Sequence, residues 1–237
     1  AEPTAEIYID VQSGTIREGT IVSNTIQATY SPNGSNIRFI GNSEAGEHRA
    51  GMWTISGNLI GSQNNNVHLT GVRGVVLTGN YIYSGHHRNV LIEDSRNVVI
   101  GPNSIGHNPD YRGKELATGI RIVNSENCNL NGVLIQDAQA GEHTVEGVVP
   151  IQREALVEIV NCRRVNMTGC QILDGTPIGL LIDGCRDALV SSCTIMEQRE
   201  EKKTVQGVVW RNSGPGNMLV QSRISGGSNG SVLADEI

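Results

Sequence analysis

The most constraining feature of the sequence is an internal repeat of about seventeen residues. Each copy combines two apolar-x-apolar segments, a turn, a polar pair and a final isoleucine. The repeat is clearest in Val67–Ile82, Val90–Ile105, Ile120–Ile135, Val157–Ile172 and Leu180–Ile195. The final isoleucine recurs eight times, as Ile26, Ile60, Ile82, Ile105, Ile135, Ile172, Ile195 and Ile224. Recurrence at this length predicts a solenoid, in which every repeat forms one coil that stacks on the next.

Two further apolar columns keep the same register. Five residues before the final isoleucine lie Ile21, Ile55, Leu77, Ile100, Leu130, Met167, Val190 and Leu219. Each coil opens with Ile9, Phe39, Leu69, Ile92, Ile122, Ile159, Ile182 or Trp210. Short stretches in which apolar and polar residues alternate predict short strands. Three strands per repeat predict an all-β, right-handed, three-sided parallel β-helix of about eight coils, stacked roughly 4.8 Å apart. We expect a single β-helix domain over residues 1–237, either whole or cut from a longer chain.

A largely polar column lies two residues before the final isoleucine. Its members are Asn24, Asn58, Asn80, Asn103, Val133, Cys170, Cys193 and Ser222. Stacked asparagines can hydrogen-bond along the rod, and asparagine tolerates the left-handed backbone of a sharp turn. With this ladder, the chain from about Glu6 to Ile224 resembles the pectate-lyase-like superfamily of right-handed parallel β-helix proteins. That superfamily includes lyases, hydrolases, epimerases, tailspikes and adhesins, so the resemblance implies a fold and leaves the function open.

Charge and composition exclude two classes of partner. The formal net charge is −6, and no cluster of Lys and Arg is interleaved with aromatic residues, so we expect no binding to nucleic acid. No apolar run approaches the roughly 18 residues of a membrane span, so we expect no membrane association. The opening residues lack the features of a signal peptide. Together with the resemblance, this favours a mature secreted protein or a fragment, with an extracellular or cell-surface location.

The five cysteines fall in the repeat. Cys162 and Cys185 occupy equivalent positions one coil apart, and so do Cys170 and Cys193. Stacking places such pairs within disulfide range, but parallel Cα–Cβ directions disfavour the bond, so we expect buried free thiols. Cys128 is expected in the core. There is no Cys-x-x-Cys pair to suggest a zinc site.

Two loop features carry titratable groups. His86, His87, His107 and Asp110 lie in the loops that flank Glu93, where they could form a metal or acid–base site or could be ordinary exposed loop residues. The charged run Glu197–Lys203 is predicted to be a solvated loop.

Candidate catalytic residues come from the outward positions of the first strand. One outward column is Tyr8, Arg38, His68, Leu91, Arg121, Glu158, Leu181 and Val209, and the other is Asp10, Ile40, Thr70, Glu93, Val123, Val160, Asp183 and Arg211. Charges concentrate in the middle coils, so a catalytic site would centre on Glu158 and Asp183. Their Cα atoms should lie roughly 8 Å apart, a separation that suits an acid and a base with a water between them, or the two sides of a calcium site.

Arg121, Glu93 and His87 would assist these two carboxylates. The alternative is a structural ladder of ion pairs, Arg121 with Glu158 and Asp183 with Arg211. No cofactor is required by this arrangement, although calcium remains compatible with it.

Two functions remain open from the sequence. The first is a polysaccharide lyase or glycoside hydrolase that binds a polysaccharide in a groove over the first strand of each coil. Against it, the chain has no Asp-Asp, Asn-Thr-Asp, Gly-His-Gly or Arg-x-Pro-x-x-Arg motif, and aromatic residues make up only 3% of the chain. The second is a non-catalytic rod, such as a tailspike-like binding module. Neither terminus shows a capping helix, so we also expect a homo-oligomer through end or side contacts, or a longer parent chain.

Overall fold

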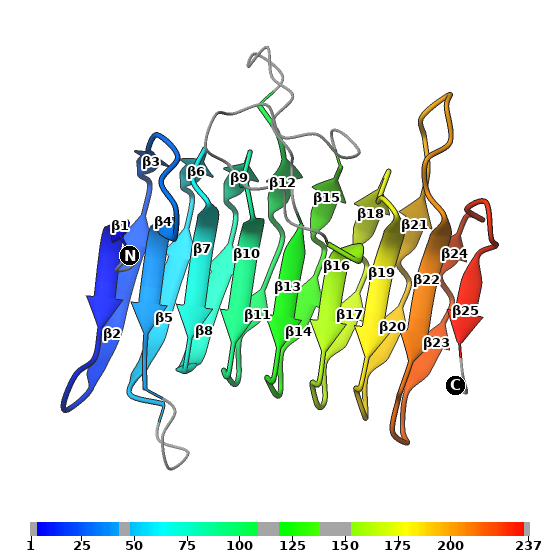
Figure 1. Ribbon diagram of the computed structural model, residues 1–237. Coiled ribbons are helices and arrows are strands. Elements are labelled where there is room, and N and C mark those ends of the chain that lie inside the picture. The colour runs from blue at the N-terminus through cyan, green and yellow to red at the C-terminus, as the bar shows by residue number, and fades with distance from the viewer. Residues whose placement is uncertain (1–3, 43–47, 109–118, 138–152, 235–237) are drawn as a thin grey trace.

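The computed structural model is a rod of stacked coils (Figure 1). It describes residues 4–42, 48–108, 119–137 and 153–234. These residues form strands and turns and no helix. It follows that the described part of the chain has no helix able to cross a membrane.

Three parallel sheets run along the rod, and each coil contributes one strand to each sheet. Sheet A contains β1 (Thr4–Asp10), β4 (Gly34–Ile40), β7 (Asn65–Thr70), β10 (Arg88–Glu93), β13 (Ile120–Val123), β16 (Ala155–Val160), β19 (Ile178–Asp183), β22 (Gln206–Arg211) and β25 (Val232–Ala234). Sheet B contains β2 (Ile16–Val22), β5 (Ala50–Ser56), β8 (Val72–Thr78), β11 (Val99–Ile100), β14 (Asn129–Asn131), β17 (Asn166–Thr168), β20 (Leu189–Ser191) and β23 (Met218–Val220). Sheet C contains β3 (Thr25–Gln27), β6 (Leu59–Gly61), β9 (Tyr81–Tyr83), β12 (Ser104–Gly106), β15 (Leu134–Gln136), β18 (Gln171–Leu173), β21 (Thr194–Met196) and β24 (Arg223–Ile224).

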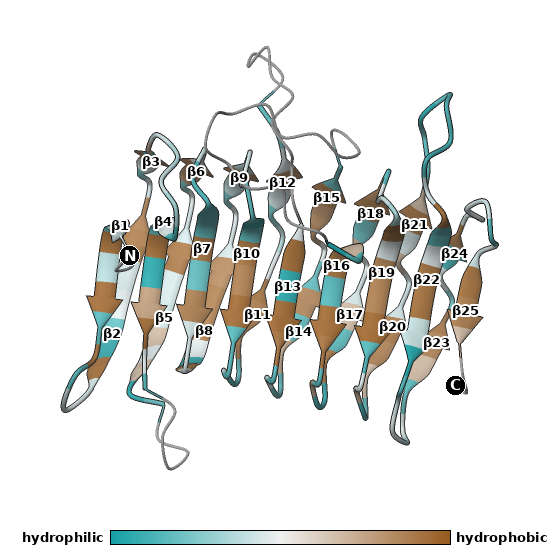
Figure 2. Cartoon of the chain, in the orientation of Figure 1, coloured by the Kyte–Doolittle hydropathy of each residue, from teal (hydrophilic) through white to brown (hydrophobic). Residues whose placement is uncertain are grey.

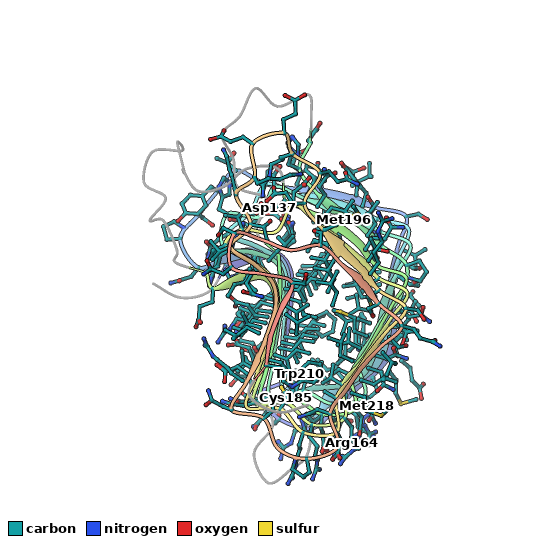
Figure 3. All side chains as sticks on the ribbon, turned by 90° about the vertical axis from the view of Figure 1, so that its right-hand side faces the viewer. Asp137, Arg164, Cys185, Met196, Trp210 and Met218 are labelled. Atoms are coloured by element: carbon teal, nitrogen blue, oxygen red, sulfur yellow. The ribbon has the colours of Figure 1, made fainter. Side chains whose placement is uncertain are left out.

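The predicted right-handed, three-sided parallel β-helix of about eight coils is confirmed, and so is its register. Ile82 pairs with Ile105, and Ile105 with Ile135, along sheet C. The opening column pairs in the same way along sheet A, from Ile9 to Trp210. Most members of the three columns are fully buried between the sheets, and Figure 3 shows Trp210 inside the rod. Hydrophobic burial of these columns, which appear brown in Figure 2, is what holds the coils together.

The asparagine ladder closes the turn between sheets B and C. The side-chain oxygen of Asn58 accepts hydrogen bonds from the backbone N–H and the side-chain amide of Asn24, at 2.9 and 3.1 Å. The side-chain oxygen of Asn80 accepts the same two hydrogen bonds from Asn58, both at 3.0 Å. The left-handed backbone was assigned to the wrong residue in the sequence analysis. The residue before the asparagine has the positive φ in three of the four coils, as Ser23, Gly57 and Gly79, and Pro102 takes this place before Asn103.

All five cysteines are free and buried, as predicted. Cys162 and Cys185 continue a turn column that begins with Ser95 and Ser125. The Ser95 hydroxyl accepts a hydrogen bond from Val72 N–H at 3.1 Å, and the Cys185 sulfur accepts one from Cys162 N–H at 3.4 Å. In these turns the thiol therefore replaces a hydroxyl as an acceptor for the coil below.

A second asparagine ladder lies where sheet C returns to sheet A. The side-chain amide of Asn36 donates to Asn66 at 2.9 Å, and that of Asn66 donates to Asn89 at 2.7 Å. All three side chains are buried. They fix the starts of β4, β7 and β10 relative to one another, which matters because these three strands carry the site described below.

The charged loop after β21 is not fully solvated, contrary to the prediction. The side chain of Glu197 is only 2% exposed. Its carboxylate pairs with Arg199 and accepts the backbone N–H groups of Lys203 and Thr204. Burial alone would raise the pKa of Glu197, but these donors lower it to about 2. One buried carboxylate thus organises a loop whose other acidic residues, Glu200 and Glu201, are exposed.

The two ends of the described rod expose apolar side chains. Tyr8 is 43% exposed at one end, and Met218 and Leu233 are 54% and 59% exposed at the other. The expected end or side contact remains a prediction.

Candidate functional site

A groove of about 420 Å³ lies over sheet A, on the face where the sequence analysis placed it. It spans β4, β7 and β10 and the segments that lead into them. Its lining residues are Asn33, Arg38, Asn64, Asn65, His68, His87, Leu91 and Glu93. Two predicted site residues, Glu93 and His87, are therefore brought together here.

A histidine–carboxylate pair forms the centre of the groove. His68 on β7 and Glu93 on β10 lie in adjacent outward columns, and the His68 Nε2 to Glu93 Oε2 distance is 2.7 Å. Thr70 pairs with Glu93 in the sheet register, and its hydroxyl donates to the same carboxylate oxygen at 3.4 Å. The His68 side chain is 14% exposed and that of Glu93 is 34% exposed. Nε2 of His68 therefore carries the proton in the neutral ring, which leaves Nδ1 as the acceptor.

The two groups set each other's charge state. Burial lowers the pKa of His68 below its ordinary value of 6.5, and Arg38 lowers it further, while Glu93 opposes both effects. The hydrogen bond from His68 lowers the pKa of Glu93. At neutral pH the pair is a neutral imidazole beside an ionised carboxylate, an arrangement in which the carboxylate stabilises the imidazolium that would form on proton uptake.

Arg38 lies directly beneath His68 in the sheet register. Its Nε and Nη1 atoms are buried and have no hydrogen-bond partner within the described residues. Burial lowers its pKa, and the nearby charge of Glu93 opposes this effect. Asn65, in the same lining, has a buried side-chain oxygen that also lacks a partner there. Arg38 lines the groove, so its positive charge would favour an anionic group there.

His87 lies at the edge of the groove toward the middle coils. Burial lowers its pKa to about 4, and the positive charge of Arg88 contributes to the shift. The His87 ring is therefore neutral at physiological pH and can accept or donate a hydrogen bond to a ligand.

Glu158 does not face an open groove, contrary to the prediction. Its side chain is 1% exposed. Oε2 accepts Arg121 at 2.6 Å and Arg88 at 3.0 Å, while Oε1 accepts Glu154 N–H at 2.9 Å and Ala155 N–H at 3.2 Å. Burial acts to raise the pKa of Glu158, but the two arginines and the amide donors outweigh it and lower the pKa. The residues before β16 cover this side chain, so it lies on the outer face of the sheet without being exposed.

Asp183 is partly exposed and paired. Arg211, its neighbour in the sheet register, donates to Asp183 Oδ2 at 2.8 Å, and Asn212 donates to Oδ1 at 2.8 Å. Arg211 also pairs with Glu154 at 2.7 Å. The alternative reading of the sequence is thus confirmed: Arg121 with Glu158, and Asp183 with Arg211, form an ion-pair ladder. A shared acid–base site built on the two carboxylates is not what their contacts show.

The charged residues of the middle coils do not fit a calcium site. The oxygens of Glu158 and Asp183 are held by arginine, amide and backbone donors rather than left open for a cation. Over residues 4–42, 48–108, 119–137 and 153–234, no three His, Cys, Asp or Glu side chains are grouped to hold a metal ion. Of the loop histidines, His86 is buried against Tyr30 and His107 accepts a hydrogen bond from Tyr81 through its carbonyl. Asp110 lies outside the described residues.

Comparison with known proteins adds the following. No family model and no curated protein matches the chain. Several solved structures do. One is a "putative glycosyl hydrolase" from Parabacteroides merdae, at 12% identity over 94% of this chain and 85% of that one, with a TM-score of 0.37. Another is ORF18 of Geobacillus virus E2, at 13% identity over 91% of this chain and 53% of that one, with a TM-score of 0.38. A third is the A-module of the mannuronan C-5 epimerase AlgE4 from Azotobacter vinelandii, at 10% identity over 97% of this chain and 81% of that one, with a TM-score of 0.31.

The strand topology described above is by itself that of a right-handed parallel β-helix. Two of the three neighbours are named for carbohydrate chemistry, a glycosyl hydrolase and a mannuronan epimerase.

Sequence reasoning missed His68 and Arg38 as functional residues, although it placed both on the outward face. The signal that could have found them is their register: His68 and Glu93 occupy neighbouring outward columns one coil apart. The sequence favoured Glu158 and Asp183 instead, because charged residues are concentrated in the middle coils. In the structure both carboxylates are paired with arginines.

Proposed function

We propose that the protein is a polysaccharide lyase that cleaves a uronic-acid polymer in the groove over β4, β7 and β10. The observation that carries the proposal is the neutral His68, held by Glu93, beside the positively charged Arg38 in the lining of the groove. A lyase needs a base near a carbon whose proton is acidified by an adjacent carboxylate, together with a cation that neutralises that carboxylate.

The groove can supply both requirements. Arg38 would bind the uronate carboxylate, which makes the neighbouring C–H more acidic. His68 would take this proton on Nδ1, and Glu93 would stabilise the imidazolium. The electron pair left on carbon forms the C4–C5 double bond as the C4–O bond breaks, and the departing sugar oxygen takes a proton. Water would supply that proton, and the neutral ring of His87 would orient the substrate through a hydrogen bond. The proposal assigns no step to a cofactor.

Glycoside hydrolysis is the less favoured reaction. It requires one carboxylic acid and one free carboxylate on either side of the bond. Glu158 is buried in an ion-paired cluster and Asp183 is held by Arg211 and Asn212, so neither is available. Action on a polysaccharide also implies an extracellular or cell-surface location, which we include in the proposal.

The test is an assay over a panel of polymers: polygalacturonate, alginate and hyaluronate against neutral xylan and dextran. Lysis of a uronate polymer produces an unsaturated sugar that absorbs in the ultraviolet. We expect His68→Ala to lower kcat by about 10²- to 10⁴-fold, the usual contribution of a positioned base. Arg38→Gln should lower kcat as well as raise KM, because Arg38 both binds the carboxylate and acidifies the neighbouring C–H, and Arg223→Gln, an exposed arginine on sheet C, is the matched control. New reducing ends without the unsaturated product, or full activity of His68→Ala, would contradict the proposal.

A further inference from the structure

A second charged feature lies along the turns that join sheet A to sheet B, at the lower edge of the rod in Figure 1. Five consecutive turns are short and alike: residues 71–75, 94–98, 124–128, 161–165 and 184–188. Their third residues bridge to one another in parallel and form a single stack: Arg73, Arg96, Glu126, Arg163 and Arg186. We call this stack the arginine ladder. Neighbouring steps are about 4.8 Å apart, the spacing of adjacent strands.

Three of the five arginines on these turns make no ion pair with any described residue. Glu126 pairs with Arg163 and, at 2.8 Å, with Arg164. Arg73, Arg96 and Arg186 make no ion pair with any described residue, and the buried Nε of Arg96 has no hydrogen-bond partner there.

The turns also contain Asp94 and Asp187. They therefore carry five arginines and three carboxylates, a positive balance in a chain whose net charge is −6. Figure 3 shows Arg164 at this edge of the rod, pointing away from the core.

The stacking itself is unfavourable without a ligand. Arg73 lies beside Arg96, and Arg163 beside Arg186, in register. Like charges on directly paired strand positions destabilise a sheet. An anion that bridges neighbouring steps would remove this repulsion. A cavity of about 460 Å³ lies at one end of the ladder, lined by Glu126, Arg163 and Arg186 among others, and its volume is within the range of small-molecule sites, about 300–1,000 Å³.

We propose that the arginine ladder is a second, non-catalytic binding surface for an acidic polysaccharide that lies along the rod axis. A polymer is favoured over a small anion because four of the five steps carry an arginine, and only a chain with repeated charges can engage several of these steps at once.

A saccharide is favoured over a nucleic acid because these five turns contain no aromatic residue on which a base could stack. They do present exposed asparagines, such as Asn97 and Asn124, that can bind hydroxyl groups. Binding here requires no reaction in the groove, although Arg96 follows Glu93 by only three residues, so one polymer could reach both.

The experiment measures binding of labelled polygalacturonate, heparin, neutral dextran and a single-stranded oligonucleotide to variants made in the His68→Ala background, where no cleavage is expected. The ladder variant is Arg73→Gln/Arg96→Gln/Arg186→Gln. The control removes the same charge from exposed residues outside the register of the ladder, as Lys202→Gln/Lys203→Gln/Arg223→Gln.

We expect the ladder variant to bind an acidic polymer about tenfold more weakly, which corresponds to roughly 0.5 kcal/mol per arginine, and to show a weaker salt dependence. The control should stay within about twofold of the parent, because exposed charges away from the ladder are screened.

Three results would overturn the proposal: equal binding by the ladder and control variants, equal binding of dextran, or equally tight binding of a single-stranded oligonucleotide. The reaction is judged separately. If no polymer is cleaved by the wild-type protein but the ladder variant still loses binding, the proposed lyase activity fails and the ladder stands.

Discussion

Glu158→Gln should destabilise the protein strongly while leaving the chemistry of the groove intact. Glu158 is 1% exposed, and its Oε2 is shared by Arg88 and Arg121, of which Arg88 is 4% exposed. A glutamine retains the oxygen that accepts Glu154 and Ala155 N–H, but it turns an amide NH₂ toward two guanidinium groups. Removing one partner of a buried ion pair costs about 3–5 kcal/mol, because the remaining charge is buried without compensation.

The measurement is thermal unfolding of the wild-type and variant proteins at several pH values. A chain of 237 residues should lose roughly 2–4 °C of Tm per kcal/mol, so we expect a decrease of roughly 6–20 °C at pH 7. The folded-state pKa of Glu158 lies below its ordinary value of 4.5, so its stabilisation is complete above that pH and is lost as the pH falls through the lowered value. The difference between the two proteins should therefore shrink in acid.

Asp183→Asn is the matched control. It removes a carboxylate one coil further along, but this ion pair is partly exposed, with side chains 20% and 35% accessible. Exposed pairs contribute about 0–1 kcal/mol, so its Tm should barely change. Equal Tm values for Glu158→Gln and the wild type would refute the reasoning that Glu158 is a buried structural charge. Loss of turnover in Glu158→Gln at unchanged Tm would restore it as a catalytic candidate.

Four further predictions follow from named contacts. Lyase activity should be constant through neutral pH and fall as the pH drops below the lowered pKa of His68, because only the neutral ring accepts a proton; a rate that rises into acid would contradict this assignment. Asn80→Ala should cost several kcal/mol in urea unfolding, since it leaves the buried N–H groups of Asn58 without an acceptor and each such group costs about 1–3 kcal/mol. Cys162→Ser should change the Tm by only a few degrees and leave it insensitive to reductant, because serine already fills this turn column in other coils; a large loss would show that the thiol has a role of its own. Glu197→Gln should remove roughly 3 kcal/mol at neutral pH, the value of a pKa lowered from 4.5 to about 2, and chemical unfolding should show this difference vanishing as the pH falls from 4.5 toward 2.

The sequence by itself determined the fold. The three apolar columns repeat once per coil, and only a three-sided stack of parallel strands buries all of them together. The asparagine column at the turn between sheets B and C could be predicted for the same reason, since a polar residue that recurs in register with buried ones must be satisfied by its own copies. The free cysteines followed from their place in that repeat.

The candidate site could be predicted only in part. Arg38, His68 and Glu93 all lie in the predicted outward columns, so the sequence limited the candidate site residues to a few positions on one face of the rod. It could not tell which outward charges face solvent and which are covered. Glu158 occupies an outward position by pattern, yet the chain that leads into β16 and the side chain of Arg88 enclose it.

Only the tertiary structure decided where unpaired charge remains. A side chain's partners come from other coils that are 23 to 70 residues away in sequence, as for Glu93 with Thr70 one coil away and Glu158 with Arg88 two coils away. The length of each intervening loop is irregular, so the sequence pattern fixes which residues stack but not how long side chains reach between coils. Arg38, with buried and unpartnered guanidinium nitrogens, and Glu158, with every carboxylate oxygen occupied, carry opposite charges in the same outward column. Whether each of these side chains finds a partner depends on residues from several coils, which the sequence of one coil does not reveal.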